Sequence, residues 1–166
     1  NLRASFQYES DDLTNVINRL NETVSENAKG EKYITVFAAV YHRKKREIQY
    51  VNCGHNPPLI MLADGSTQQL ELGSVGLGMF REIPSLETGT VQLDRDSTLV
   101  CFTDGLVEQE NEEGIPYGMQ RMEDILRARR GMPVKDVQNA LIDSVKEFKG
   151  EEPSFDDTAL MVVRFH

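Results

Sequence analysis

The residues best suited to chemistry are aspartates at the ends of two predicted strands. Asp104 closes the apolar run VCFTDG at 100–105, and Asp156 opens the sequence DDT at 156–158, just before the last apolar run. A carboxylate at a strand end is held rigidly, and a glycine beside it lets a second chain or a ligand approach closely. Two such carboxylates from distant segments predict a site for a hard divalent cation, Mg²⁺ or Mn²⁺.

Each aspartate motif also has an ordinary structural interpretation. Asp-Gly is a common turn sequence, so Asp104 alone is weak evidence. Asp156 and Asp157 are adjacent like charges, which repel unless they are solvated or bound to a cation. In an extended chain their side chains point to opposite sides, so one could bind a cation while the other orients or caps. A solvated loop before a strand is the alternative.

A third motif, NCGHNPP at 52–58, predicts a rigid turn where a strand ends. His55 in this turn could act as a general base or a metal ligand, or could be a hydrogen-bonded structural residue. No Ser or Cys in a nucleophile elbow accompanies it. A haloacid-dehalogenase reaction is excluded, because Phe102 stands where the nucleophilic aspartate of that motif would be.

The composition limits the other possibilities. The chain has 166 residues, with 18 basic and 27 acidic side chains and a net charge of −9. Phosphate backbones are bound by clustered Lys and Arg, so this charge argues against a nucleic-acid partner. The longest apolar run, 33–41, is too short to span a bilayer, so we expect no membrane contact. Cys53 and Cys101 fit small buried side chains in a reducing compartment, which favours the cytoplasm.

The hydrophobic pattern predicts an α+β fold in which helices cover antiparallel sheets. Apolar residues at helical spacing predict an amphipathic helix over 10–26 and two more over 119–126 and 134–148. Run 33–41 is typical of a central strand covered on both faces. The remaining predicted strands are 46–53, paired with 33–41, then 59–62 with 68–72, 90–93 with 97–103 around the turn 94–96, and finally 158–165.

Five motifs in order carry a resemblance to a known family. They are NCGHNPP at 52–58, LG with GLG at 72–78, FTDGLVE at 102–108, YG at 117–118 and DDT at 156–158. The chain resembles the SpoIIE-like (stage II sporulation protein E) type of the PPM family of metal-dependent protein phosphatases. This implies one domain over 1–166 with an α-β-β-α sandwich of antiparallel sheets flanked by helices.

The resemblance implies a serine/threonine phosphatase. Asp104 and Asp156 take the places of catalytic metal ligands, whereas Gly105, Asp157, Asn52 and His55 would support the site without binding metal directly. The complete domain would use two Mn²⁺ or Mg²⁺ ions. The implied substrate is a phosphorylated bacterial signalling protein of the anti-sigma-factor antagonist type, so that the enzyme regulates a sigma factor. An upstream sensor or regulatory domain is also implied.

The chain departs from the family at its beginning. The family's Gly-Asp-x-x-Asp and Asp-x-x-Gly-His-Gly motifs are absent, and the sequence contains no Gly-Asp dipeptide at all. Because the first residue is not Met, we expect an N-terminally truncated domain that lacks its first strands and part of its metal site. Alone it should be inactive and bind metal weakly. The exposed sheet edge should drive self-association, such as a homodimer. The alternative is a non-catalytic pseudo-phosphatase that binds a partner.

Overall fold

The structure, a computed structural model, describes residues 12–28, 32–154 and 156–166. They form two compact units: unit 1 comprises 1–57 with 70–93, and unit 2 comprises 58–69 with 94–166. Each unit therefore takes two separate segments of the chain. No helix in the described ranges is long and apolar enough to cross a membrane.

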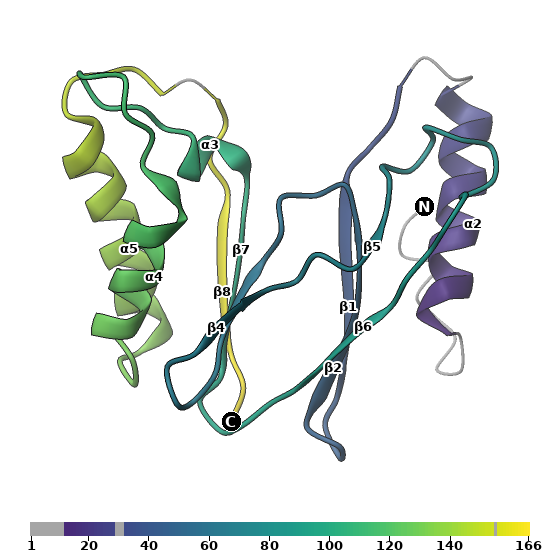
Figure 1. The fold of residues 1–166 in the computed structure, drawn as a ribbon, viewed down its shortest axis with the longest axis horizontal. Coiled ribbons are helices and arrows are strands. Elements are labelled where there is room, and N and C mark those ends of the chain that lie inside the picture. Colours follow the sequence, from purple (N-terminus) through teal and green to yellow (C-terminus); the bar gives the residue numbers. More distant parts are fainter. Residues whose placement is uncertain (1–11, 29–31, 155) are drawn as a thin grey trace. The chain divides into compact units, whose positions relative to one another are not determined.

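Unit 1 is a four-stranded sheet with one long helix against it (Figure 1). Its elements are α2 (Leu13–Ala28), β1 (Val36–His42), β2 (Glu47–Cys53), β5 (Gly73–Ser74) and β6 (Gly89–Gln92). Strand β2 pairs antiparallel with β1 and β6 and parallel with β5. The apolar stripe of α2 buries Leu13 and Ile17 against Val51, Cys53 and Leu77, which forms the core of this unit.

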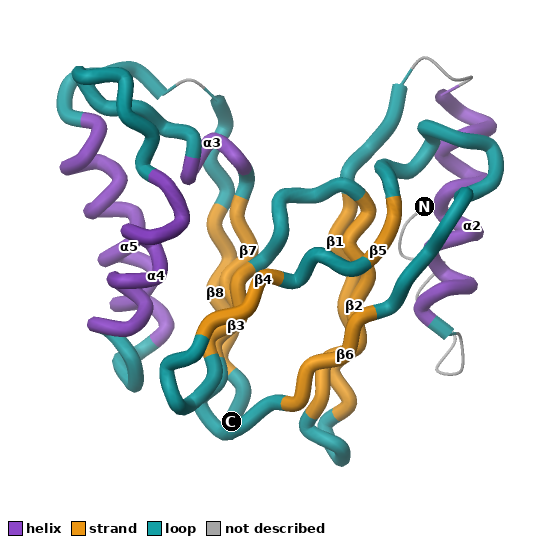
Figure 2. Tube along the Cα trace, viewed as in Figure 1, coloured by secondary structure: helices purple, strands orange, loops and turns teal. Residues whose placement is uncertain are grey.

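Unit 2 is a second four-stranded sheet, of order β4-β3-β7-β8, with two long helices on one face (Figure 2). Its strands are β3 (Leu59–Met61), β4 (Thr67–Gln69), β7 (Thr98–Phe102) and β8 (Leu160–Arg164), and its helices are α3 (Asp104–Val107), α4 (Gly118–Ala128) and α5 (Val134–Lys149). All neighbouring strands are antiparallel. Met122 and Leu126 of α4 and Leu141 of α5 pack onto Val100 and Phe102 of β7.

The predicted α+β fold with two sheets and flanking helices is confirmed, and all three long helices lie where their apolar spacing placed them. Residues 10 and 11 of the first predicted helix lie outside the described residues. The prediction of a single domain over 1–166 stays a prediction.

Three details of the predicted strands are wrong. Residues 90–93 and 97–103 do not form a hairpin, because β6 pairs with β2 and β7 pairs with β3 and β8. Strand β1 is not a covered central strand: among the described residues it pairs only with β2, and residues 39–41 are exposed. The sheets are not wholly antiparallel, since β2 and β5 run parallel. These pairings depend on contacts that are distant in sequence.

Candidate metal site

Asp104 stands where β7 turns into the short helix α3. The buried residues of β7 end at Phe102, Thr103 is extended, and Asp104 is the first residue of α3. The Asp104 side chain is exposed, and its Oδ1 accepts a hydrogen bond from the backbone N–H of Gly105 at 3.0 Å. The carboxylate is thus held just after the end of the inner strand β7, where it is exposed to solvent.

The Thr103 hydroxyl joins this strand end to the segment that carries Asp156. It donates to the carbonyl oxygen of Asp157 at 2.9 Å and accepts from the backbone N–H of Ala159 at 2.9 Å. The Thr103 N–H also donates to the Ala159 carbonyl at 3.1 Å. Thr103 therefore does not cap α3 with its side chain, because its hydroxyl is used to hold the neighbouring segment.

Gly105 allows the two segments to approach closely. A Cβ atom at this position would lie 3.0 Å from the Asp157 carbonyl oxygen and 3.3 Å from Asp156 Cβ. Asp156 is itself fixed, since its Oδ1 accepts from the Asp157 N–H at 2.7 Å. The structure therefore brings the segments of Asp104 and Asp156 together, and Asp156 and Asp157 are both exposed.

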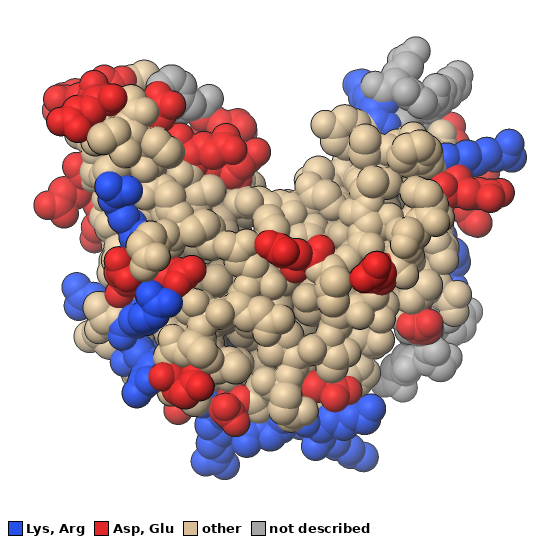
Figure 3. Space-filling view, viewed as in Figure 1, with Lys and Arg blue, Asp and Glu red and all other residues tan. Residues whose placement is uncertain are grey.

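Other acidic side chains gather at the same end of unit 2. Figure 3 shows a concentration of Asp and Glu there. The loop after α3 carries four exposed glutamates, Glu108, Glu110, Glu112 and Glu113. Crowded carboxylates repel one another, and a bound cation relieves that repulsion.

The residue types at this site suit a divalent cation, but the described residues supply too few ligands to hold one. Carboxylate oxygens are the ligands that Mg²⁺ and Mn²⁺ prefer. Within the described part of the chain, however, no group of three or more His, Cys, Asp or Glu side chains is arranged to hold a metal ion. Asp104 and Asp156 would therefore supply one part of a metal site and need further ligands to complete it.

Asn52 and His55 belong to unit 1, where Asn52 closes the turn after β2. Asn52 is 4% exposed; its Nδ2 donates to the Leu70 carbonyl at 3.2 Å and its Oδ1 accepts from the His55 N–H at 2.8 Å. Gly73 is required beside it, because a Cβ there would lie 1.8 Å from the Asn52 carbonyl oxygen. Asn52 thus has a clear structural role, and the predicted supporting role of both residues at a metal site stays a prediction.

Asn56 in the same turn was not predicted from the sequence. Its Nδ2 is buried and has no hydrogen-bond partner among the described residues, which is uncommon for a buried amide. Nothing in the sequence alone separates it from Asn52, because both asparagines lie in one rigid motif.

The cysteines offer no nucleophile at neutral pH. Cys53 and Cys101 are free thiols. Burial raises the pKa of Cys53, and it raises the pKa of Cys101 to about 11. Since the thiolate is the reactive form, both remain poorly reactive.

A model of the stage II sporulation protein E (SpoIIE) family matches residues 1–166. The chain belongs to the SpoIIE family. Among curated relatives, phosphoserine phosphatase RsbU of Bacillus subtilis is 26% identical over 153 residues, which are 90% of this chain and 44% of RsbU. The chain thus spans less than half of that relative's length.

Solved structures share the fold of this chain. The SiaA-PP2C domain of Pseudomonas aeruginosa has a TM-score of 0.84 at 20% identity, covering 99% of this chain and 66% of that one. The phosphatase domain of the cell-fate determinant SpoIIE from B. subtilis, presoaked with Mn, has a TM-score of 0.66 at 16% identity, covering 98% and 70%. At these identities the likeness shows the fold.

Proposed function

We propose that this chain forms part of the catalytic domain of a metal-dependent phosphatase that hydrolyses phosphoserine or phosphothreonine in a protein. The observation that carries the proposal is the hydrogen-bonded junction that holds the segments of Asp104 and Asp156 together. The relation to a phosphoserine phosphatase supports the reaction, and the Mn-presoaked relative supports the metal.

In this proposal Asp104 and Asp156 hold Mn²⁺ or Mg²⁺ together with ligands from elsewhere in the protein. A pair of such ions supplies an activated water and neutralises phosphoryl charge, so no protein nucleophile is required. Gly105 allows the two segments to lie close together. The hydrogen bond from the Thr103 hydroxyl to the Asp157 carbonyl fixes the distance between them. The residues of this chain therefore position oxygen ligands.

We further propose that the substrate is a phosphorylated bacterial signalling protein of the anti-sigma-factor antagonist type, that a regulatory domain controls the reaction, and that the protein works in the cytoplasm. The regulatory domain is supported by the length of RsbU, of which this chain covers 44%, and the two free thiols are compatible with a reducing compartment. We also propose that these residues alone are inactive and bind metal weakly.

One observation favours a second candidate, a non-catalytic module that binds a partner through the same fold. The described residues offer no three-residue metal-binding group. If the natural protein supplies no further acidic ligands, Asp104 and Asp156 could not hold a catalytic metal pair.

The test is metal-dependent phosphate release from a phosphoserine peptide by the natural protein that carries these residues. Substituting a residue that merely supports a metal ligand typically lowers activity 10- to 100-fold, so Asp104→Asn or Asp156→Asn should lower Mn²⁺-dependent release by at least about 100-fold. Asp143→Asn, an exposed aspartate on α5, is the matched control and should leave release unchanged.

The remaining outcomes separate the two candidates. Full activity in both Asp104→Asn and Asp156→Asn would overturn the proposed site. A natural protein that releases no phosphate with either Mn²⁺ or Mg²⁺ would support the non-catalytic module. Robust release by these residues alone would contradict the proposed incompleteness of the site.

A further inference from the structure

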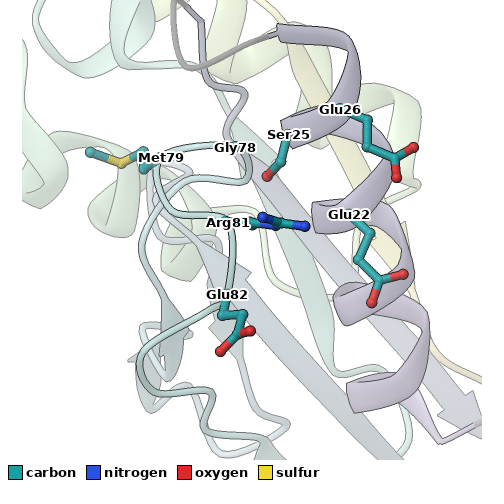
Figure 4. Close-up of a pocket in the computed structure, with 7 residues that line it drawn as sticks. All are labelled: Glu22, Ser25, Glu26, Gly78, Met79, Arg81 and Glu82. Carbon is teal, nitrogen blue, oxygen red and sulfur yellow. The ribbon is translucent and has the colours of Figure 1, made fainter.

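Unit 1 contains a groove of about 580 Å³ between α2 and the loop that follows β5 (Figure 4). We call it the α2 groove; it is lined by Glu22, Ser25, Glu26, Gly78, Met79, Arg81 and Glu82. In Figure 4 the Arg81 side chain reaches from the loop toward α2, whereas Met79 is directed away from the helix. The groove belongs to neither aspartate motif.

The wall of the groove is preformed, because one buried side chain holds the loop. Asn21 is 3% exposed, and its Nδ2 donates to the carbonyl oxygens of Phe80 and Arg81, at 3.1 Å each. Its Oδ1 accepts from the Gly78 N–H at 2.9 Å. Gly78 is required here, since its φ is +86° and a Cβ would lie 2.6 Å from Val24 Cγ1. Because the loop is already ordered, binding of a partner to it costs little conformational entropy in the loop.

Apolar side chains stand exposed beside the groove. Tyr33 is 60% exposed, Met79 50% and Phe80 51%. Tyr33 and Met79 are neighbours, because a Cβ built on Gly76 would lie 3.0 Å from Tyr33 Cδ2 and 3.5 Å from Met79 Sδ. Aromatic residues, Met and Arg are enriched at protein interfaces, and contiguous exposed apolar surface marks interaction sites.

The charge around this surface is predominantly negative. Glu22 and Glu26 are one helical turn apart on α2, and Glu82 lines the groove from the loop, where the cation Arg81 reaches toward the helix (Figure 4). The ion pairs recorded among the described residues involve none of the three glutamates. Like charges four residues apart weaken a helix, so the Glu22–Glu26 pair does not stabilise α2.

We propose that the α2 groove and the exposed side chains of Tyr33, Met79 and Phe80 form a docking surface for a basic amphipathic segment of a partner protein. Apolar side chains of that segment pack against Met79 and its aromatic neighbours, since the flexible thioether adapts to irregular partners. Its Lys or Arg side chains meet the carboxylates of Glu22, Glu26 and Glu82. The proposal is independent of phosphatase activity.

The test titrates the natural protein with a short amphipathic peptide of Leu and Lys, and with the same peptide carrying Glu in place of Lys. The Lys peptide should shift the amide resonances of 21–26 and 76–82, and the Glu peptide should not. The triple variant Glu22→Gln, Glu26→Gln, Glu82→Gln should bind the Lys peptide about tenfold or more weakly, because it loses three exposed charge contacts.

A matched variant separates docking from general attraction to an acidic protein. Asp143→Asn, Glu147→Gln, Glu151→Gln removes the same charge from exposed positions of unit 2 and should leave the affinity nearly unchanged. Met79→Ser should weaken binding at high salt, where charge attraction is screened.

Several results would overturn the proposal. Both triple variants could weaken binding of the Lys peptide equally, the Lys peptide could shift resonances elsewhere in the chain instead, or the Glu peptide could bind as tightly as the Lys peptide. Shifts of the groove residues by Mn²⁺ alone, with no response to the Lys peptide, would indicate a cation site in place of a docking surface.

Discussion

At the scale of single residues, the proposed metal site depends on one hydroxyl. Replacing Thr103 by Val leaves the Asp157 carbonyl and the Ala159 N–H without their partner, so the segment of Asp156 should drift from Asp104. We expect about a tenfold loss of Mn²⁺ affinity in the natural protein, measured by calorimetric titration, because removing a group that orients a metal ligand has this effect. Thr103→Ser should restore the affinity.

A control for the Thr103 prediction lies at the other end of the same strand. The Thr98 hydroxyl donates to the Asp96 carbonyl and accepts from Arg164 Nε. Thr98→Val should lower the free energy of unfolding by about 1 kcal/mol, as Thr103→Val does, and leave Mn²⁺ affinity unchanged. Equal affinity loss in both variants would show that Thr103 acts only through stability.

Residue type and position at predicted strand ends singled out Asp104 and Asp156, and their role as metal ligands stays a prediction. Thr103 was not singled out, because its hydroxyl partner is 54 residues away in sequence. Asn21 was missed for the same reason, since its acceptors lie 59 and 60 residues further along the chain.

At the scale of elements, α2 and the 78–81 loop are held together by Asn21. Asn21→Leu preserves the approximate volume but leaves the buried Gly78 N–H and the part-buried Arg81 carbonyl without a side-chain partner, while the Phe80 carbonyl keeps the Ser25 hydroxyl; an unpaired buried group costs about 1–3 kcal/mol. We expect the free energy of unfolding to fall by at least about 2 kcal/mol. Hydrogen exchange of the Gly78 amide should accelerate.

Asn27 provides the comparison on the same helix. Its Nδ2 donates only to the Thr23 carbonyl on the exposed face, so Asn27→Leu should change stability by less than about 0.5 kcal/mol. If the two variants behaved alike, the loss would reflect helix propensity and not the anchoring of the loop.

The elements predicted best from sequence were those formed by local contacts. Helices α4 and α5 begin and end within a residue or two of the predicted ranges, because helical periodicity is set by neighbours three and four residues apart. The turn at 94–96 was misread as a hairpin. Asp96 has a φ of +68° there, but the flanking strands find partners in different sheets, a choice that local sequence does not determine.

At the scale of the whole molecule, the two sheets differ in how their outer strands are protected. Within the described residues, β1 and β8 each pair on one side only. Strand β8 carries Arg164, and a charge on an edge strand discourages pairing with another chain. Strand β1 carries no Lys, Arg, Asp or Glu, and its Val40 is 40% exposed. The outer strands β4, β5 and β6 also lack such charges, but they have only 3, 2 and 4 residues against 7 in β1, so β1 is the edge at which a second strand is expected to add.

This asymmetry predicts self-association of the 166-residue chain through β1. Val40→Lys should shift the chain toward the monomer in light scattering at high concentration, because a lysine on the added edge would be desolvated by a neighbouring strand. Met161→Lys places the same charge on β8, where Met161 is 54% exposed, and should leave the association unchanged. A monomeric parent chain, or equal effects of the two lysines, would contradict pairing at β1.

The net charge of −9 opposes association at low salt, so the fraction of dimer should rise with ionic strength if strand addition drives it.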